Sequence, residues 1–250
     1  MPFKKIKDFL NPKKINSTAI VYFAYINPLK DWQLFIANQL NDLKKTDILS
    51  ASDLHIVVSN PFKVSEVEGF FKNRKHLYKT IEFHEENKFE YWGINYIWNL
   101  AREHKYDYLI YFHTKGISHE NDKRSNKKEM LTHYTFNKWQ SLVKIFEENK
   151  DINKIGLFPG WELNQQGEVI KGGWIWYNFW WARSSYIRTL EHPNPNPKTR
   201  YYYESWLSTS TDLNHNKLQD NFSIYSMDKT LYTGQETLEN MEKLIKKTKK

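Results

Sequence analysis

Two hydrophobic patterns alternate along the first half of the chain. Short continuous apolar runs, which are typical of strands buried on both faces, fall in Ser17–Asn27, Asp53–Asn60, Thr80–His84 and Tyr106–Phe112. Between them, apolar residues recur at helical spacing in Asp31–Lys45, Val64–Lys75 and Phe89–His104. This alternation of strands and helices with short connections predicts an α/β fold. We expect a Rossmann-like, mainly parallel central sheet with helices on both faces.

The second half of the chain has a less regular pattern. Its expected elements are a polar loop at 118–128, a helix at Glu129–Glu148, a short strand at Lys154–Pro159, a turn-rich hairpin at Gly167–Gly173, a Trp-rich segment at Trp174–Arg183 and a helix or short turn that begins at Tyr201. We therefore predict one domain at 17–234, with a first half at 17–116 and a second half at 129–234. A basic N-terminal segment at 1–16 and a basic C-terminal tail at 235–250 flank it, and we expect the tail to be a Lys-rich helix or a frayed end.

The fourth predicted strand ends in the most informative polar cluster. The aromatic run Tyr108–Phe112 stops at His113-Thr114-Lys115-Gly116. In open α/β sheets, ligands bind just beyond the carboxyl ends of the strands. His113 and Lys115 are two residues apart, so their side chains leave an extended chain on the same side. They are the best candidates for a functional pair.

Composition narrows the classes of partner. The net charge of +8 favours an anionic partner, although many of the lysines are expected simply to be solvated. The absence of Cys excludes disulfides and thiolate chemistry and is compatible with the cytoplasm. No apolar run is long enough to span a bilayer. Neither the dinucleotide fingerprint G-x-G-x-x-G nor a P-loop occurs.

The YFHTKG phrase, together with the later IGLF, YNFWWARSSYI and RYYYESWL segments, resembles a known family. The order of these pieces is similar to that of GT-A glycosyltransferases of the rhamnan-synthesis-F-like type from bacterial and viral polysaccharide synthesis. The resemblance covers roughly residues 18–208. It implies a GT-A-like fold, a nucleotide-sugar donor bound by the 17–116 half, and a glycan or lipid-linked glycan acceptor.

The resemblance also locates the leaving group. GT-A enzymes carry an Asp-x-Asp triplet after this strand, which holds a metal on the donor diphosphate, and His113 and Lys115 occupy those two positions here. Their substitution removes the carboxylates that a hard cation prefers and supplies positive charge directly. We therefore predict metal-independent transfer without a cofactor. Lys115 would stabilise the diphosphate, while His113 would be a ligand contact, a supporting residue or a strand-end cap.

An inverting transferase also needs a carboxylate base near the acceptor hydroxyl. Glu204 in RYYYESWL matches that position, and Glu162 and Asp212 are the next candidates. The family's Gly-Asn-Phe-Trp-Trp phrase is present except that Tyr177 replaces its glycine. The predicted acceptor-binding residues are Tyr177, Trp180, Trp181 and Arg183. The predicted donor-binding residues are Tyr25, Asn27, Ser59, Asn60, Asn87, Glu90, Thr114 and Gly116.

Two other functions fit parts of the sequence. A non-catalytic carbohydrate-binding protein would suit the aromatic content, and a nucleic-acid-binding protein would suit the charge. The sequence contains no nucleic-acid-binding motif, so we expect no nucleic-acid partner. We expect a cytoplasmic protein. Phe3, Ile6, Phe9 and Leu10 beside five lysines at 1–16 leave open a peripheral contact with an acidic membrane.

Overall fold

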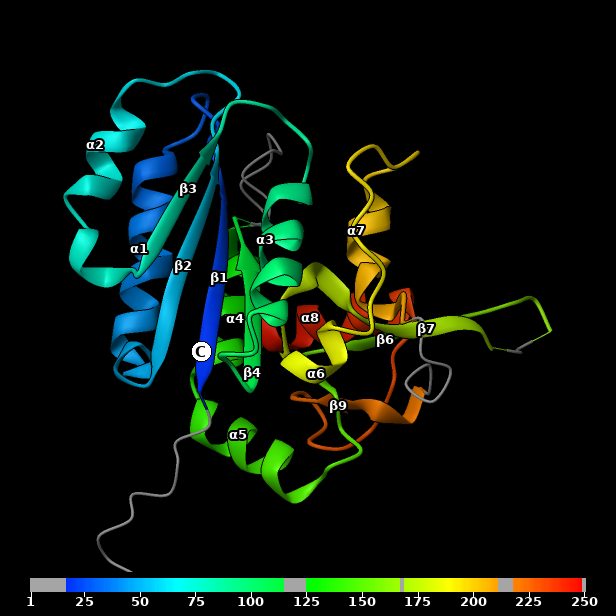
Figure 1. Cartoon of the computed structure of the whole chain (residues 1–250). Coiled ribbons are helices and arrows are strands. Elements are labelled where there is room, and N and C mark those ends of the chain that lie inside the picture. The colour runs from blue at the N-terminus through cyan, green and yellow to red at the C-terminus, as the bar shows by residue number, and fades with distance from the viewer. Residues whose placement is uncertain (1–16, 115–124, 167–168, 211–217, 249–250) are drawn as a thin grey trace, which may run out of the picture.

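A seven-stranded sheet with the strand order β3-β2-β1-β4-β8-β5-β9 organises the chain. The computed structural model describes residues 17–114, 125–166, 169–210 and 218–248 (Figure 1). The expected α/β fold with a mainly parallel sheet is confirmed, because β8 is the only strand of this sheet that runs against its neighbours. The strands of the sheet are β1 (Thr18–Tyr25), β2 (Ser52–Ser59), β3 (Thr80–His84), β4 (Tyr108–His113), β5 (Lys154–Gly156), β8 (Trp180–Arg183) and β9 (Asn221–Ser223).

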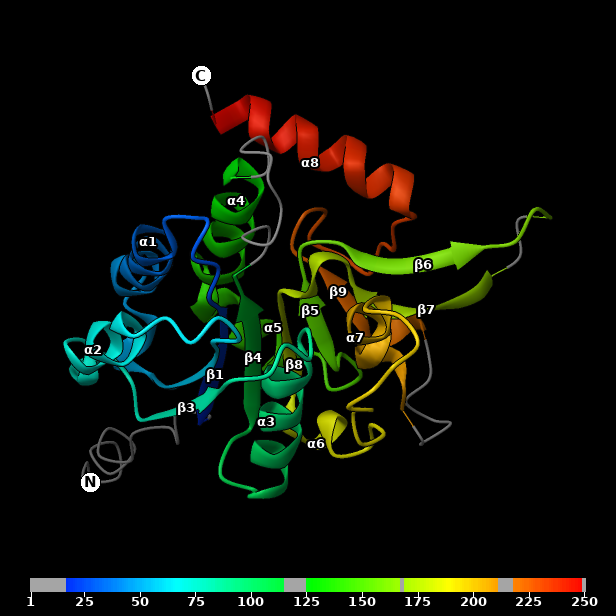
Figure 2. The ribbon, with the colours of Figure 1, turned by 90° about the horizontal axis from the view of Figure 1, so that it is seen from above.

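Helices cover both faces of this sheet. Figure 2 shows α1, α4 and α8 on one side and α3 and α6 on the other. Even-numbered residues of β1, such as Tyr22, pack with the first group, and odd-numbered ones, such as Phe23, pack with the second. The helices are α1 (Trp32–Lys45), α2 (Glu66–Lys72), α3 (Tyr91–Arg102), α4 (Ser125–Phe136), α5 (Trp139–Glu148), α6 (Ser184–Ile187), α7 (Tyr201–Ser205) and α8 (Gly234–Thr248).

Helix α3 approaches the sheet closely at Gly93. A Cβ added at Gly93 would lie 2.7 Å from the Cβ of Phe23 and 3.0 Å from the ring of Tyr111. Any larger residue would therefore push α3 away from β1 and β4. This close packing places the N-terminus of α3, where Glu90 is the N-cap residue, beside the carboxyl ends of those two strands.

The second half adds a separate two-stranded hairpin and several short turns. Strands β6 (Pro159–Leu163) and β7 (Val169–Ile175) pair antiparallel and extend away from the main sheet (Figure 1). A hairpin is therefore present, but residues 169–173 of the stretch predicted as a turn-rich hairpin all belong to strand β7. The 3₁₀ turns are η2 (Ile48–Ser50), η3 (Lys75–Leu77), η5 (Trp176–Asn178), η6 (Trp206–Ser208) and η7 (Leu218–Asp220).

Three predicted boundaries differ from the structure. The helix expected at Glu129–Glu148 is two helices, α4 and α5, and α4 begins inside the segment predicted as a loop. The C-terminal tail, expected outside the domain as a Lys-rich helix or a frayed end, is mostly helix α8, whose Met241 is fully buried in the core beside α4. It therefore belongs to the domain.

The N-terminal segment at 1–16 lies outside the described residues. Within the part of the chain that the structure describes, no helix is both long enough and apolar enough to cross a membrane.

Candidate active site

The strand order reverses between β1 and β4. The chain builds β1, β2 and β3 outward in one direction and then places β4 on the other side of β1. In open α/β sheets such a reversal leaves a crevice beyond the carboxyl ends of the two strands, and ligands bind there. Tyr25 ends β1 and His113 ends β4, so the predicted functional pair begins at this position.

Thr114 joins the two strand ends. Its backbone N–H donates to Phe23 O at 3.1 Å, and its hydroxyl accepts from the Tyr25 N–H at 2.9 Å. The side chain is buried, so the hydroxyl is held against β1. Thr114, a predicted donor-binding residue, thus has a structural function: it fixes the direction in which the chain leaves β4 toward Lys115.

His113 is enclosed by protein atoms on both sides of its ring. Its Nε2 lies 3.2 Å from Tyr177 O and its Nδ1 lies 3.7 Å from a carboxylate oxygen of Glu90. Because a carbonyl oxygen can only accept, Nε2 carries a hydrogen. Only 6% of His113 is exposed. Of the three roles expected for His113, this geometry contradicts a direct ligand contact and fits a supporting residue.

Glu90 is the centre of this polar cluster. Its carboxylate accepts hydrogen bonds from the Tyr111 hydroxyl at 3.3 Å and from the side-chain amide of Asn178. Burial, followed by the charge of Glu90, raises the pKa of Tyr111 well above its usual value, so its hydroxyl remains a donor. The Asn178 amide also donates to Tyr203 O at 3.3 Å. It therefore links the cluster to α7.

Two consecutive residues beside His113 have left-handed backbone conformations. Tyr177 has φ 69° and Asn178 has φ 59°. Asn tolerates this region, whereas a tyrosine there costs on the order of 1–2 kcal/mol. A glycine at position 177 would adopt this φ without strain. The substitution noted in the sequence thus falls where the backbone most favours glycine.

Glu204 lies on α7 near Tyr177. Burial raises the pKa of Tyr177 to about 12, and the negative charge of Glu204 adds to the effect. Glu204 is half-buried. Glu204, the predicted base, and Tyr177, a predicted acceptor-binding residue, are therefore neighbours. Asn178, the residue after Tyr177, provides the hydrogen bond to α7.

Three predicted acceptor-binding residues lie elsewhere. The Trp180 and Trp181 side chains are fully buried, and their indole N–H groups donate to Asn178 Oδ1 and Thr135 O. Their expected function as a sugar platform is contradicted, because neither ring presents a surface to a ligand. Arg183 pairs with Tyr108 at the start of β4, and its guanidinium donates to carbonyls of 146, 149 and 152. Arg183 stabilises the end of α5, and it lies beside the start of β4, whereas His113 lies at the end of β4.

The predicted donor residues at the other strand ends mainly make loop contacts. Asn27 and Asn87 accept from N–H groups two residues further on, and Asn60 exchanges two hydrogen bonds with Val64. Ser59 is fully buried and donates to Glu86 O. Tyr25, at the carboxyl end of β1, remains partly exposed. Lys115, Gly116 and Asp212 lie outside the described residues, and Glu162 forms an ion pair with Lys171 on the hairpin.

The sequence pattern did not indicate Asn178 or Tyr111 as residues of this polar cluster. Tyr111 could have been found from its spacing, because it lies two residues before His113 and so faces the same side of β4. Asn178 occurs inside the phrase that carried the resemblance, yet nothing in a lone Asn indicates that it links three segments.

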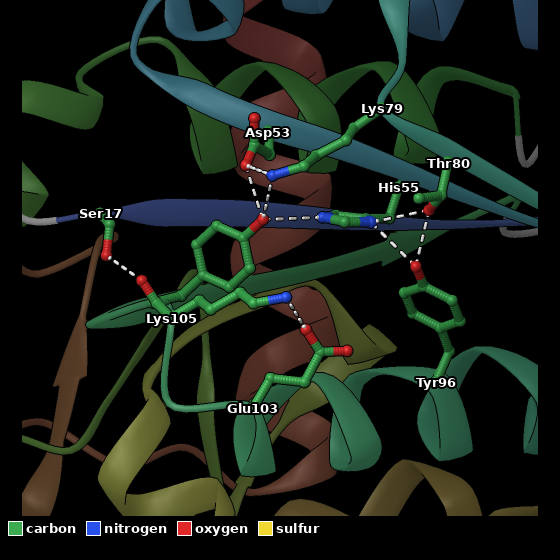
Figure 3. Close-up of polar contacts among 9 residues, drawn as sticks. Ser17, Asp53, His55, Lys79, Thr80, Tyr96, Glu103 and Lys105 are labelled. Carbon is green, nitrogen blue, oxygen red and sulfur yellow. Dashed lines mark hydrogen bonds and ion pairs between the residues drawn. The ribbon is translucent and has the colours of Figure 1, made fainter.

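A second polar cluster lies at the opposite end of the strands, where β2 and β3 begin (Figure 3). Lys79 Nζ lies 2.6 Å from the carboxylate of Asp53, which also accepts from the Tyr106 hydroxyl at 2.6 Å. The hydrogen-bond network continues from the Tyr106 hydroxyl to His55 Nε2, which lies 3.3 Å away. His55 Nδ1 lies 2.8 Å from Thr80 Oγ1 and 2.9 Å from the Tyr96 hydroxyl. Burial lowers the pKa of His55 to about 4, so the ring is neutral at physiological pH.

The strand end lacks the ligand set of the Asp-x-Asp triplet. Position 113 is a histidine whose two nitrogens face protein atoms, and position 115 is a lysine. Among the residues whose placement is described, no group of three or more His, Cys, Asp or Glu side chains could hold a metal ion. The residues at the strand end therefore do not fit the family's metal site.

Comparisons with solved structures find distant likenesses, of which three are described here. No protein-family model and no curated protein matches the chain. The crystal structure of HddC from Yersinia pseudotuberculosis has 9% identity and a TM-score of 0.42, over 90% of this chain and 99% of that one. The same protein complexed with GMP-PN has 8% identity and a TM-score of 0.39, over 73% and 82%.

A candidate nucleotide-diphospho-sugar transferase from Desulfovibrio desulfuricans G20 has 11% identity and a TM-score of 0.31, over 71% of this chain and 65% of that one. These likenesses are too distant to indicate an activity for this chain.

Proposed function

We propose that this protein is a glycosyltransferase that moves a sugar from a nucleotide-diphosphate donor to a glycan acceptor with inversion and without a metal ion. The observation that carries the proposal is that η5 contacts both the end of β4, which precedes Lys115 in the sequence, and α7, which bears Glu204. A cation-bearing strand end and a carboxylate on adjoining elements are what transfer from a diphosphate leaving group requires.

The proposed reaction has one displacement step. The acceptor hydroxyl oxygen attacks the anomeric carbon, a new C–O bond forms, and the bond from that carbon to the diphosphate oxygen breaks. The acceptor proton passes to the Glu204 carboxylate, and the nucleoside diphosphate leaves with the bonding electron pair. Lys115 stabilises the negative charge that grows on the diphosphate. Thr114 holds the strand end that leads to Lys115.

The first experiment tests donor binding and metal dependence together. Thermal unfolding is measured with UDP-glucose, GDP-mannose, dTDP-rhamnose and the free nucleoside diphosphates, each in EDTA and in manganese. We expect at least one nucleotide sugar to raise the melting temperature in EDTA, because a ligand that binds the folded state stabilises it. A shift that occurs only with manganese would contradict metal independence.

The second experiment tests the base. Glu204→Gln removes the proton acceptor but keeps the shape of the side chain, so turnover should fall by about 10²–10⁴-fold while the donor-induced thermal shift is unchanged. Glu162→Gln, which alters a carboxylate on the hairpin, is the matched control and should retain activity. If Glu162→Gln abolishes turnover and Glu204→Gln does not, the assignment of the base is wrong. Binding of donors without any transfer or hydrolysis would favour a carbohydrate-binding protein.

A further inference from the structure

Glu90 was expected to bind the donor, but its surroundings indicate another function. Its side chain is 15% exposed. Its carboxylate already accepts from Tyr111 and Asn178 and faces the His113 ring. All three of these partners belong to the protein, and they hold the carboxylate inside the fold. The carboxylate therefore acts on the protein rather than on a ligand.

The contacts of Glu90 join segments that are far apart in the sequence. Glu90 begins α3, Tyr111 and His113 belong to β4, and Asn178 belongs to η5. Through Asn178 the cluster reaches the backbone of Tyr203 on α7, next to Glu204. A shift of the Glu90 carboxylate would thus change contacts at the end of β4 and at α7, the helix that carries Glu204.

His113 transmits this arrangement. Nε2 donates to the carbonyl of Tyr177, a residue held in a strained left-handed conformation, while Nδ1 faces Glu90. The ring thus lies between the carboxylate and the turn that precedes Trp180. Since Nε2 is hydrogen-bonded to a carbonyl and Nδ1 faces a carboxylate, both contacts bear on the orientation of the ring.

We infer that Glu90 is a positioning residue, which orients His113 and thereby holds the end of β4 and the Tyr177–Asn178 turn in the geometry needed for transfer. This inference rests on the proposed function. It differs from donor binding in its consequence, because a positioning residue supports the rate of the chemical step and not the affinity for the donor.

The test is a double-mutant cycle between Glu90→Gln and His113→Ala. Glu90→Gln keeps the size of the side chain and a carbonyl acceptor but removes the charge. We expect kcat to fall by on the order of tenfold or more with the donor dissociation constant unchanged. If Glu90 acts through His113, adding Glu90→Gln to His113→Ala should produce less than a twofold further loss, because residues in direct contact are non-additive.

The matched control is Glu82→Gln, which removes the carboxylate of another Glu–His pair. Glu82 lies 3.5 Å from His84 and is 51% exposed. Its substitution should leave kcat unchanged. A weaker donor affinity in Glu90→Gln, or losses that multiply in the double mutant, would overturn the inference. So would a lower melting temperature with normal activity per folded molecule.

A measurement without turnover separates this inference from the proposed function. In protein labelled with ¹⁵N-histidine, the ring resonances of His113 are assigned by their loss in His113→Ala. We expect Glu90→Gln to shift the Nδ1 resonance and Glu82→Gln to leave it in place. If the wild-type protein neither transfers nor hydrolyses any nucleotide sugar, the proposed function fails, and the resonance shift alone decides whether Glu90 orients His113. An unmoved resonance would overturn the inference.

Discussion

The residues at the end of β4 show how neighbouring side chains in a strand can have opposite tasks. His113 points toward α3 and Glu90, whereas the Thr114 hydroxyl binds β1. The buried Thr114 hydroxyl is the acceptor for the Tyr25 N–H. A buried donor that loses its acceptor costs more than an average hydrogen bond gains.

Thr114→Val should therefore lower the free energy of unfolding by about 1–3 kcal/mol, since valine has the same shape but no acceptor. Urea denaturation measures the change. Thr230→Val, at an exposed position, is the control and should change the free energy by less than about 0.5 kcal/mol. Equal effects of the two substitutions would show that the hydroxyl does not hold the strand ends together.

At this scale the sequence predicted a position for the candidate site but not the contacts that each side chain makes. His113 and Lys115 were found because a buried strand that stops at a polar cluster marks an edge of the sheet. The positions of Trp180, Trp181 and Arg183 were not predictable. Strand β8 runs antiparallel to β4, so Arg183 lies beside the start of β4 and not beside its end. Hydrophobic pattern determines burial, whereas strand direction depends on pairing between distant segments.

At the scale of elements, the polar cluster at the beginning of β2 and β3 makes stability depend on pH. His55 of the unfolded chain takes up a proton near its ordinary pKa of 6.5, but folded His55 does so only near about 4. The unfolded state therefore binds more protons between these values, and stability falls as the pH drops through this window. The pKa of His84 is also lowered, chiefly by burial, which acts in the same direction.

We expect acidification from pH 7 to pH 4 to lower the free energy of unfolding by about 3 kcal/mol through His55. Urea denaturation of the wild type and of His55→Asn across this range measures the effect. The variant should be less stable at pH 7, with a smaller dependence on pH. A dependence equal to that of the wild type would show that His55 is not responsible.

Helix α8 offers a second test at this scale. Met241 is fully buried in the core, whereas Leu238 on the same helix is 47% exposed. Met241→Ala should cost about 2–5 kcal/mol, because it removes packed atoms and leaves a cavity. Leu238→Ala should cost less than about 0.5 kcal/mol. Thermal or urea unfolding measures both, and equal losses would contradict the packing of this helix on the domain.

Long and strongly periodic elements were the predictable ones. The strands β1, β2, β3 and β4 and the helices α1 and α3 were expected within two residues of their observed ends, because their apolar patterns are continuous or regularly spaced. Strand β9 was not, because Asn221–Ser223 is short and polar and becomes a strand only by pairing with β5. Long-range pairing of that kind leaves no local signal.

At the scale of the whole molecule, a buried ion pair connects the last strands to the rest. Lys154 Nζ lies 2.8 Å from Asp220, and the two side chains are 2% and 6% exposed. Burial lowers the pKa of Lys154, and the charge of Asp220 opposes this. The same ammonium donates to the Tyr186 hydroxyl, so β5, η7 and α6 meet at one charge.

Asp220→Ala should cost about 3–5 kcal/mol, because it leaves the Lys154 charge buried without its carboxylate. The double variant Lys154→Met with Asp220→Leu should cost less than the single one, since no uncompensated charge remains. Urea denaturation measures the difference. Glu148→Ala, which breaks an exposed i,i+4 pair with Lys144, is the control and should cost less than about 1 kcal/mol.

The antiparallel strand β8 also determines when, during synthesis of the chain, the sheet can be completed. One edge of β4 is covered by β8, which lies about seventy residues later in the chain, and β5 gains its outer neighbour β9 later still. While the chain is being synthesised, the aromatic edge of β4 therefore has no partner, and uncovered edges of this kind favour aggregation. The first half at 17–116 should consequently be insoluble when expressed alone. A shortened gene needs to extend at least through β8 before a usable protein can be recovered.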